Sequence, residues 1–206
     1  MVYKNLYNRF LFSFLFFAIY FISLNNKYLL FVFGTFIYLI IFYEILQFFN
    51  KLFKLILLYL FSSYLCFILY FLISFDYKLF NFFVFTIIIF DSFSFFTGKF
   101  LGKYYIFKHL SPKKTLEGYL GGIFFTNASL IGYFYFINND KNITTLITLL
   151  NLTVFISIVG DLIESYFKRQ NNIKDSSKYL PGHGGFFDRF DSFIAAIIML
   201  VPFSFL

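Results

Sequence analysis

The chain has 206 residues, of which 60% are hydrophobic and 13% charged, and its formal net charge is +7. One globular core cannot bury so much apolar surface, so the composition excludes an ordinary soluble domain and predicts an all-α integral membrane protein. The single cysteine, Cys66, excludes an internal disulfide and a thiolate zinc cluster. Because the basic residues lie in short loops between apolar runs, we expect a lipid bilayer and no nucleic acid as partner.

Seven apolar runs follow one another along the chain. They lie at about 10–24, 28–49, 55–75, 79–97, 116–137, 143–163 and 190–206. The last six are long enough to cross a hydrocarbon layer as helices. The first follows Lys4 and Arg9 and is compatible with a signal-peptide core, but no small-residue cleavage site comes after it, so we expect a retained span. The sequence thus predicts about seven transmembrane helices.

The distribution of Lys and Arg predicts the orientation of these helices. With the amino terminus inside, only Lys27, Lys78 and Lys141 lie in outer loops, and the remaining basic residues all lie in inner segments. This asymmetry follows the positive-inside rule and places the loops at 98–115 and 164–189 in the cytoplasm.

Acidic residues at bilayer depth need a reason, because an ionised acid there costs about 2.5–3.5 kcal/mol on insertion scales. The acids near the inner ends of the spans are Glu44, Asp91, Glu117, Asp161 and Glu164. Two more, Asp188 and Asp191, start the last span. Together they predict a polar cavity that opens to the cytoplasm.

The end of the sixth span carries a polar face. Asp161, Glu164, Ser165 and Lys168 follow at i, i+3, i+4 and i+7, so a helix would present all four on one side. The alternative is an interfacial helix end whose charges reach back to the membrane surface.

Asp188 and Asp191 are one helical turn apart, and either could instead cap the last span at its amino end. Carboxylates from two helix ends suit a hard cation with oxygen ligands, such as Mg²⁺. The lysines and arginines beside them suit phosphate oxygens. At a membrane surface, this combination predicts a phosphate-bearing substrate with a lipid part.

Two loop features accompany these acids. The turn at 181–185 contains Gly184 and Gly185, whose backbone can approach a phosphate closely, and His183, which could be a general acid or base or only a loop organiser. Lys113 and Lys114 precede the fifth span and form either a positive-inside anchor or a cationic clamp facing Asp161.

The stretch from Ser165 to Asp191 contains one long motif. It runs Ser-x-apolar-Lys-Arg, four residues, Lys-Asp-x-small, two residues, then apolar-Pro-x-His-Gly-Gly-apolar-x-Asp-Arg-apolar-Asp. In this motif the chain resembles the phosphatidate cytidylyltransferases, also called CDP-diacylglycerol synthases, whose signature it matches at every specified position. GDLIES at 160–165, SPKKTLEG at 111–118 and residues 91–99 also resemble family elements.

The resemblance implies transfer of a cytidylyl group from CTP to phosphatidate, which releases pyrophosphate and forms CDP-diacylglycerol, with Mg²⁺ as cofactor. It implies a multi-pass protein of the bacterial inner membrane, with the active site facing the cytoplasm, and raises a homodimer as the assembly. Family members commonly have more spans than we count here. We therefore expect a reduced N-terminal transmembrane region at 1–80 and a catalytic region at 81–206.

Residue roles follow from the same resemblance and the local chemistry. Asp161 and Asp188 are expected as the main metal ligands, with Glu164 and Asp191 as supporting acids. The candidates for the catalytic step are Lys168, Arg169, His183, Arg189, Glu164 and Asp191. The candidates for substrate binding are Ser165, Lys113, Lys114, Lys174, Lys178, Gly184, Gly185, Asp91 and Glu117.

Two other functions fit parts of the pattern. A CTP-dependent kinase of polyprenol or phytol would also join membrane helices to acidic and basic loops, but the full signature argues against it. A transporter would use the buried acids for ion passage and predicts functional polar groups on both faces, whereas the outer loops at 25–27 and 75–78 are short.

Overall fold

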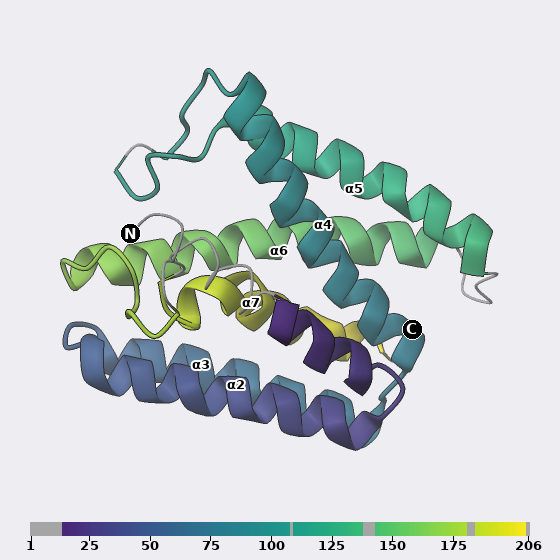
Figure 1. Ribbon diagram of the computed structural model, residues 1–206, viewed down its shortest axis with the longest axis horizontal. Coiled ribbons are helices and arrows are strands. Elements are labelled where there is room, and N and C mark those ends of the chain that lie inside the picture. The colour runs from purple at the N-terminus through teal and green to yellow at the C-terminus, as the bar shows by residue number, and fades with distance from the viewer. Residues whose placement is uncertain (1–13, 108, 138–142, 181–183, 205–206) are drawn as a thin grey trace.

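A computed structural model describes residues 14–107, 109–137, 143–180 and 184–204, and in these residues the chain is helical with no β-strand (Figure 1). A short apolar helix occupies Phe14–Ser23. The longer helices are α2 (Lys27–Phe48), α3 (Phe53–Ile73), α4 (Tyr77–Leu101), α5 (Leu116–Ile137), α6 (Ile143–Gln170) and α7 (Phe187–Phe203).

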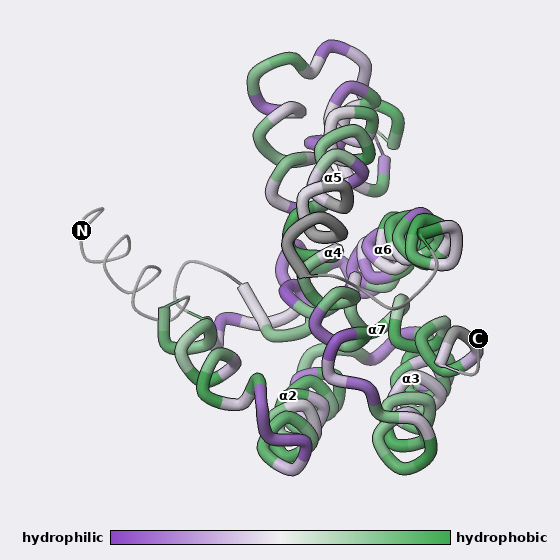
Figure 2. The backbone as a smooth tube through the Cα atoms, turned by 90° about the vertical axis from the view of Figure 1, so that its right-hand side faces the viewer, coloured by the Kyte–Doolittle hydropathy of each residue, from purple (hydrophilic) through white to green (hydrophobic). Residues whose placement is uncertain are grey.

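Four helices, α2, α3, α4 and α6, are long and apolar enough to cross a membrane by length and composition. The prediction of an all-α, multi-pass membrane protein is therefore confirmed. The count of seven spans and the side on which each loop lies stay predictions. Figure 2 shows α2 and α3 as nearly continuous apolar tubes, with hydrophilic residues gathered in the connecting segments.

Three helices extend beyond the spans that hydropathy predicts. α4 continues to Leu101, α6 continues to Gln170, and α7 already begins at Phe187. Hydropathy marks only the part of a helix that matches the hydrocarbon, whereas backbone hydrogen bonding continues into the polar region. The extra turns of α6 and α7 carry four charged residues of the signature, Lys168, Arg169, Asp188 and Arg189.

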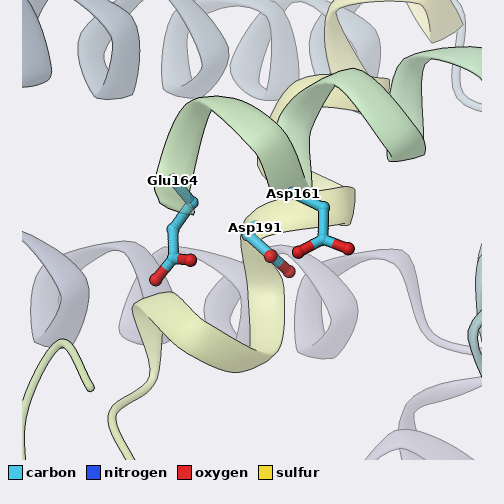
Figure 3. Close-up of side chains that lie close together, drawn as sticks. All are labelled: Asp161, Glu164 and Asp191. Atoms are coloured by element: carbon cyan, nitrogen blue, oxygen red, sulfur yellow. The ribbon is translucent and has the colours of Figure 1, made fainter. Parts of the chain in front are cut away.

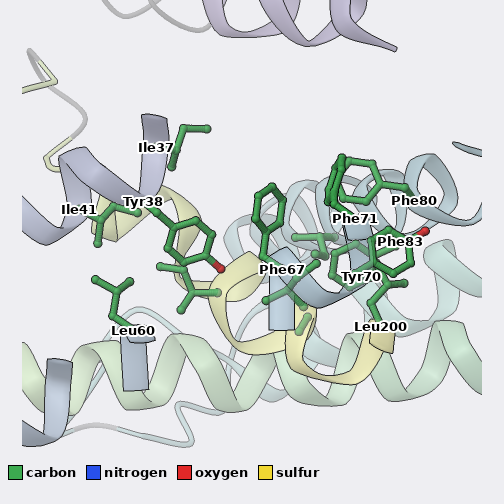
Figure 4. Close-up of a cluster of buried hydrophobic side chains, with 14 of the residues drawn as sticks. Ile37, Tyr38, Ile41, Leu60, Phe67, Tyr70, Phe71, Phe80, Phe83 and Leu200 are labelled. Carbon is green, nitrogen blue, oxygen red and sulfur yellow. The ribbon is translucent and has the colours of Figure 1, made fainter. Parts of the chain in front are cut away.

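Aromatic and aliphatic side chains of α2, α3, α4, α6 and α7 form the core, part of which is drawn in Figure 4. Phe67 of α3 is fully buried and stacks on Phe31 of α2 at 5.7 Å between ring centroids. The hydroxyls of Tyr38 and Ser63 lie 2.5 Å apart, and Ser63 Oγ donates to the carbonyl of Ile194 at 2.6 Å. These contacts hold α7 against the α2–α3 hairpin.

α5 packs mainly on α4. α4 crosses α6 obliquely from the level of the α2–α3 hairpin, so that α5 lies on the other side of α6 from that hairpin (Figure 1). The α4–α5 pair is closely packed, because a Cβ on Gly118 would lie 2.8 Å from the carbonyl oxygen of Ser94 and 3.2 Å from Gly98 Cα. Gly121 and Gly122 likewise leave no room for a Cβ. These three glycines therefore permit the close packing of α4 and α5.

α6 and α7 cross closely at Gly160. A Cβ at that position would overlap Ala195 and would lie 2.8 Å from the carbonyl oxygen of Asp191. The acidic face of α6 therefore meets the first turns of α7.

Candidate functional site

A cavity of about 860 Å³ lies between α4, the start of α5, the 102–115 connection and the facing parts of α6 and α7. Its charged lining residues are Asp91, Lys99, Lys113, Lys114, Asp161, Asp188, Arg189 and Asp191. The predicted polar cavity is thus present, and it contains both signs of charge. That mixture suits a ligand that also carries both signs, such as a metal–phosphate complex.

One stripe of α4 forms a wall of this cavity. Asp91, Ser94, Gly98 and Lys99 line the cavity and follow at helical spacing, so they share one face. Sequence reasoning named Asp91 as a candidate and missed Lys99. Its spacing of two turns from Asp91 is the signal that would have found it.

Three carboxylates meet where α6 crosses α7. One oxygen from each of Asp161, Glu164 and Asp191 lies within 4.8 Å of the others (Figure 3). Glu164 is buried with 1% of its surface exposed, and its Oε1 has no hydrogen-bond partner among the residues that the structure describes. The predicted polar face of α6 thus points at α7.

Two lysines accompany this cluster. Lys114, from the 102–115 connection, forms an ion pair with Asp161. Lys168 Nζ lies 2.6 Å from Glu164 Oε2 and 2.6 Å from Asp188 Oδ1, and so bridges α6 and α7. Burial lowers the pKa of Lys114, and the nearby carboxylates of Asp191 and other acids oppose that shift. Lys114 therefore faces Asp161, as the clamp alternative predicts, and its role in binding substrate stays a prediction.

Asp188 has a different environment from the other acids. Its Oδ2 accepts hydrogen bonds from the amides of Ser176 and Gly185, each at 2.8 Å, and from Ser176 Oγ at 3.1 Å. Its Oδ1 accepts the bond from Lys168. Gly184 has a φ of +85°, and a Cβ there would lie 2.5 Å from Asp188 Oδ2. Ser176, Gly184 and Gly185 therefore pack closely around the carboxylate of Asp188.

Arg169, a predicted catalytic residue, contacts backbone carbonyls. Its Nε donates to the carbonyl of Leu110 at 3.2 Å, and its Nη1 donates to that of Ile173 at 3.4 Å. These bonds tie the 102–115 connection to the end of α6.

Glu117 also accepts hydrogen bonds from backbone amides, and it is not among the residues that line the described cavity. Its Oε2 accepts from the amide of Lys103 at 3.0 Å, and its carboxylate also accepts from the amide of Tyr104 at 3.2 Å. These donors follow the end of α4, whose last carbonyls and following amides need partners.

The remaining candidates have varied positions. Lys174 and Lys178 are exposed on the connection between α6 and α7, and Ser165 of α6 is buried. His183 lies outside the described residues. Lys113, a candidate for substrate binding, and Arg189, a candidate for the catalytic step, both line the cavity.

The acidic cluster fits the magnesium ion that the family resemblance implies. Its donors are carboxylate oxygens from two helices, which Mg²⁺ prefers. The buried Glu164 Oε1, without a hydrogen-bond donor in the described part of the chain, is the kind of oxygen that a cation would satisfy.

The fold and the cavity define a multi-pass membrane protein with a site of mixed charge at the ends of its helices. A sequence profile of the cytidylyltransferase family matches residues 2–206, and the chain therefore belongs to that family.

Relatives with a described activity match the chain over about half its length. It is 43% identical over 119 residues to a phosphatidate cytidylyltransferase of Haemophilus influenzae, a match that covers 56% of this chain and 41% of the relative. It is 40% identical over 113 residues to the phosphatidate cytidylyltransferase of Staphylococcus aureus, covering 53% and 42%. The chain thus spans less than half the length of the curated relatives it matches.

Proposed function

We propose that this protein transfers the cytidylyl group of CTP to phosphatidate, forming CDP-diacylglycerol and pyrophosphate. The observation that carries the proposal is the cavity in which the acids of the signature and the cations of the 102–115 connection meet. Membership of the cytidylyltransferase family and the names of its relatives support the same reaction.

This reaction depends more on stabilising the negative charge of the phosphates than on a general base. An ionised phosphate oxygen of phosphatidate attacks the α-phosphorus of CTP, and the bond to the bridging oxygen of pyrophosphate breaks with its electron pair. Because a phosphomonoester is largely ionised near pH 7, no strong general base is required. Lys99, Lys113, Lys114 and Arg189 would bind the phosphate oxygens of both substrates and bring the two anions together.

We infer that Asp161, Glu164 and Asp191 hold Mg²⁺, with Asp188 contributing where Lys168 releases its Oδ1. When bound, the ion would stabilise the charge that develops on the leaving pyrophosphate. The lysines beside the cluster would then neutralise the carboxylate charge left over and orient the phosphates.

The membrane location and the orientation of the cavity follow from the same proposal. Phosphatidate and CDP-diacylglycerol remain in the bilayer, while CTP is soluble, so the cavity would open at the cytoplasmic surface of a bacterial inner membrane. The Lys and Arg distribution of the sequence supports that orientation. The family relation raises a homodimer, which the mass of the protein in detergent, measured by light scattering, would test.

The test uses purified protein in mixed detergent–lipid micelles with Mg²⁺, phosphatidate and CTP labelled either in the cytosine ring or at the γ-phosphate. We expect the ring label to enter the lipid fraction and the γ label to leave as pyrophosphate. The same incubation with a polyprenol tests the kinase alternative, in which the γ label would enter lipid. Absence of ring label from the phosphatidate-derived lipid would contradict the proposal.

A further inference from the structure

Glu44 is a buried acid outside the signature and outside the cavity lining that the structure describes. It lies near the end of α2, is 0% exposed, and is the one acid of that apolar helix. An acid in such a place must be matched by donors, because burying a carboxylate without hydrogen bonds is costly.

Among the described residues, its donors come from the connection between α6 and α7 and from the start of α7. Glu44 Oε1 accepts from Ser177 Oγ at 2.6 Å and from the amide of Phe186 at 2.8 Å. Glu44 Oε2 accepts from the amide of Phe187 at 2.9 Å and from Ser176 Oγ at 3.3 Å. The carboxylate of Glu44, on α2, is therefore hydrogen-bonded on both oxygens to the signature segment.

Two of these bonds complete the amino end of α7. That helix begins at Phe187, and its N-cap residue, Phe186, makes no capping bond with its own side chain. Glu44 satisfies the amides of both residues from another helix, where a carboxylate also interacts favourably with the helix dipole.

The bonds of Glu44 alternate with those of Asp188. The amide of Gly185 donates to Asp188 and the next amide donates to Glu44. Ser176 Oγ lies within hydrogen-bond distance of both carboxylates. A Cβ on Gly185 would lie 2.7 Å from both Glu44 Oε1 and Ser177 Oγ, so the glycine permits this approach. A shift of Glu44 would therefore move the donors that hold Asp188.

We propose that Glu44 is a positioning residue, which fixes the carboxylate of Asp188 at the cavity wall through Ser176 and the amides of 185–187. The inference rests on the proposed function for the reaction that this position serves. It makes the N-terminal helical region part of the active-site scaffold, although the signature lies entirely in the C-terminal half.

The decisive variant is Glu44→Gln. Each oxygen of Glu44 accepts one backbone amide, so either orientation of the glutamine amide would set its NH₂ group against an N–H. We expect kcat per folded molecule to fall about 10- to 100-fold, as for groups that orient catalytic ligands. KM for CTP should stay within about threefold, because the loss concerns the transition state rather than ground-state binding.

Asn171→Ala is the matched control. Asn171 Oδ1 accepts from the amides of Asn50 and Lys51 at 2.9 and 2.7 Å, and its Nδ2 donates to the carbonyl of Lys51 at 3.1 Å. It thus clamps the same α2–α3 hairpin to α6 at another point. We expect lower thermal stability with kcat per folded molecule within about twofold of the wild type.

Hydrogen exchange of the peptide covering 185–187 provides a readout that does not depend on activity. In Glu44→Gln these amides should exchange at least about tenfold faster, a change equivalent to loss of a bond to a charged group. Asn171→Ala should leave their exchange unchanged. If Glu44→Gln fails to fold, Ser177→Ala removes one of the four donors and should change kcat and exchange in the same direction by less.

The outcomes separate this inference from the proposed function. If the wild type makes CDP-diacylglycerol and Glu44→Gln keeps its kcat, or if both variants lose kcat equally, the positioning role is overturned and the function stands. If the wild type is inactive in the assay, the proposed function fails, and exchange at 185–187 alone decides whether Glu44 holds the segment.

Discussion

Two groups of carboxylates in this protein differ in their supply of donors. Asp188 and Glu44 each accept at least two backbone amides and a serine hydroxyl. In the cluster of Asp161, Glu164 and Asp191, by contrast, Asp161 and Glu164 pair with lysines, and Asp191 Oδ1 accepts from the amide of the next residue at 2.8 Å. Glu164 Oε1 has no hydrogen-bond partner among the described residues.

The difference indicates a division of work. A carboxylate surrounded by amides fixes a loop, because amides in a folded segment cannot move away without breaking the structure. A carboxylate beside other carboxylates and flexible lysines can exchange those partners for a cation. We therefore expect Asp188 and Glu44, the loop-holding group, to position the site. The cluster of Asp161, Glu164 and Asp191 is expected to bind the ion.

The largest effect is expected for Asp161→Asn, which removes a charge from the cluster without changing its volume. CDP-diacylglycerol formation should fall at least about 100-fold, as when a group that stabilises developing charge is removed. The protein should still insert in the membrane. The measurement is product formation against Mg²⁺ concentration, in which half-maximal activity should require more Mg²⁺.

Asp76→Asn is the control for Asp161→Asn. Asp76 caps α4 by accepting from the amide of Lys78 at 2.9 Å, and asparagine can make the same bond. Its activity should stay within about twofold of the wild type. Normal turnover in Asp161→Asn would contradict the assignment of the cluster as the metal site.

Asp188→Ala tests whether Asp188 binds the metal ion, holds the loop, or does both. We expect it also to lower magnesium-dependent product formation strongly while the protein inserts, because the change removes a predicted metal ligand together with the acceptor for Ser176 and Gly185. The residual activity of Asp188→Asn separates these roles. A higher Mg²⁺ requirement, as in Asp161→Asn, supports a metal ligand, whereas an unchanged requirement with lower kcat assigns Asp188 to the loop-holding group.

The sequence contained enough information for the helices and for the acidic cluster. Apolar runs located the helices, and the i, i+3, i+4, i+7 spacing of α6 identified the face that meets α7. These features depend on local periodicity, which is visible in one segment at a time.

The role of the loop-holding group could not be predicted from the sequence, because it depends on tertiary contacts. Glu44 meets Ser177 and Phe187 across 133 and 143 residues, and no spacing rule joins α2 to those donors. Arg169 was interpreted as catalytic because the signature contains it, yet its contacts are with backbone carbonyls. A motif marks which residues matter but does not separate residues that contact substrate from residues that hold the loops.

Gly185→Ala would disturb the loop-holding group alone. Its Cβ would press on Glu44 Oε1 and Ser177 Oγ, each 2.7 Å away, and would overlap Ser176 Oγ. We expect the free energy of unfolding to fall by about 1–3 kcal/mol, as for other overpacked sites. Thermal unfolding in detergent measures it.

Gly132→Ala is the matched control for Gly185→Ala, because a Cβ there meets no atom of the described residues within 4 Å. A helical Gly→Ala change should be neutral or stabilise by up to about 1 kcal/mol. Equal destabilisation of both variants would show that the loop is not closely packed around Glu44.

The smallest effect is expected for Glu117→Gln, which asks whether a third acid belongs with the loop-holding group. The sequence suggested that Glu117 binds substrate, but its carboxylate accepts the amides of Lys103 and Tyr104. Glutamine keeps one oxygen acceptor, so KM for CTP and kcat should both stay within about twofold of the wild type, with a slightly lower melting temperature. A tenfold rise in KM with unchanged stability would instead return Glu117 to the substrate site and show that donor supply alone does not sort the acids of this protein.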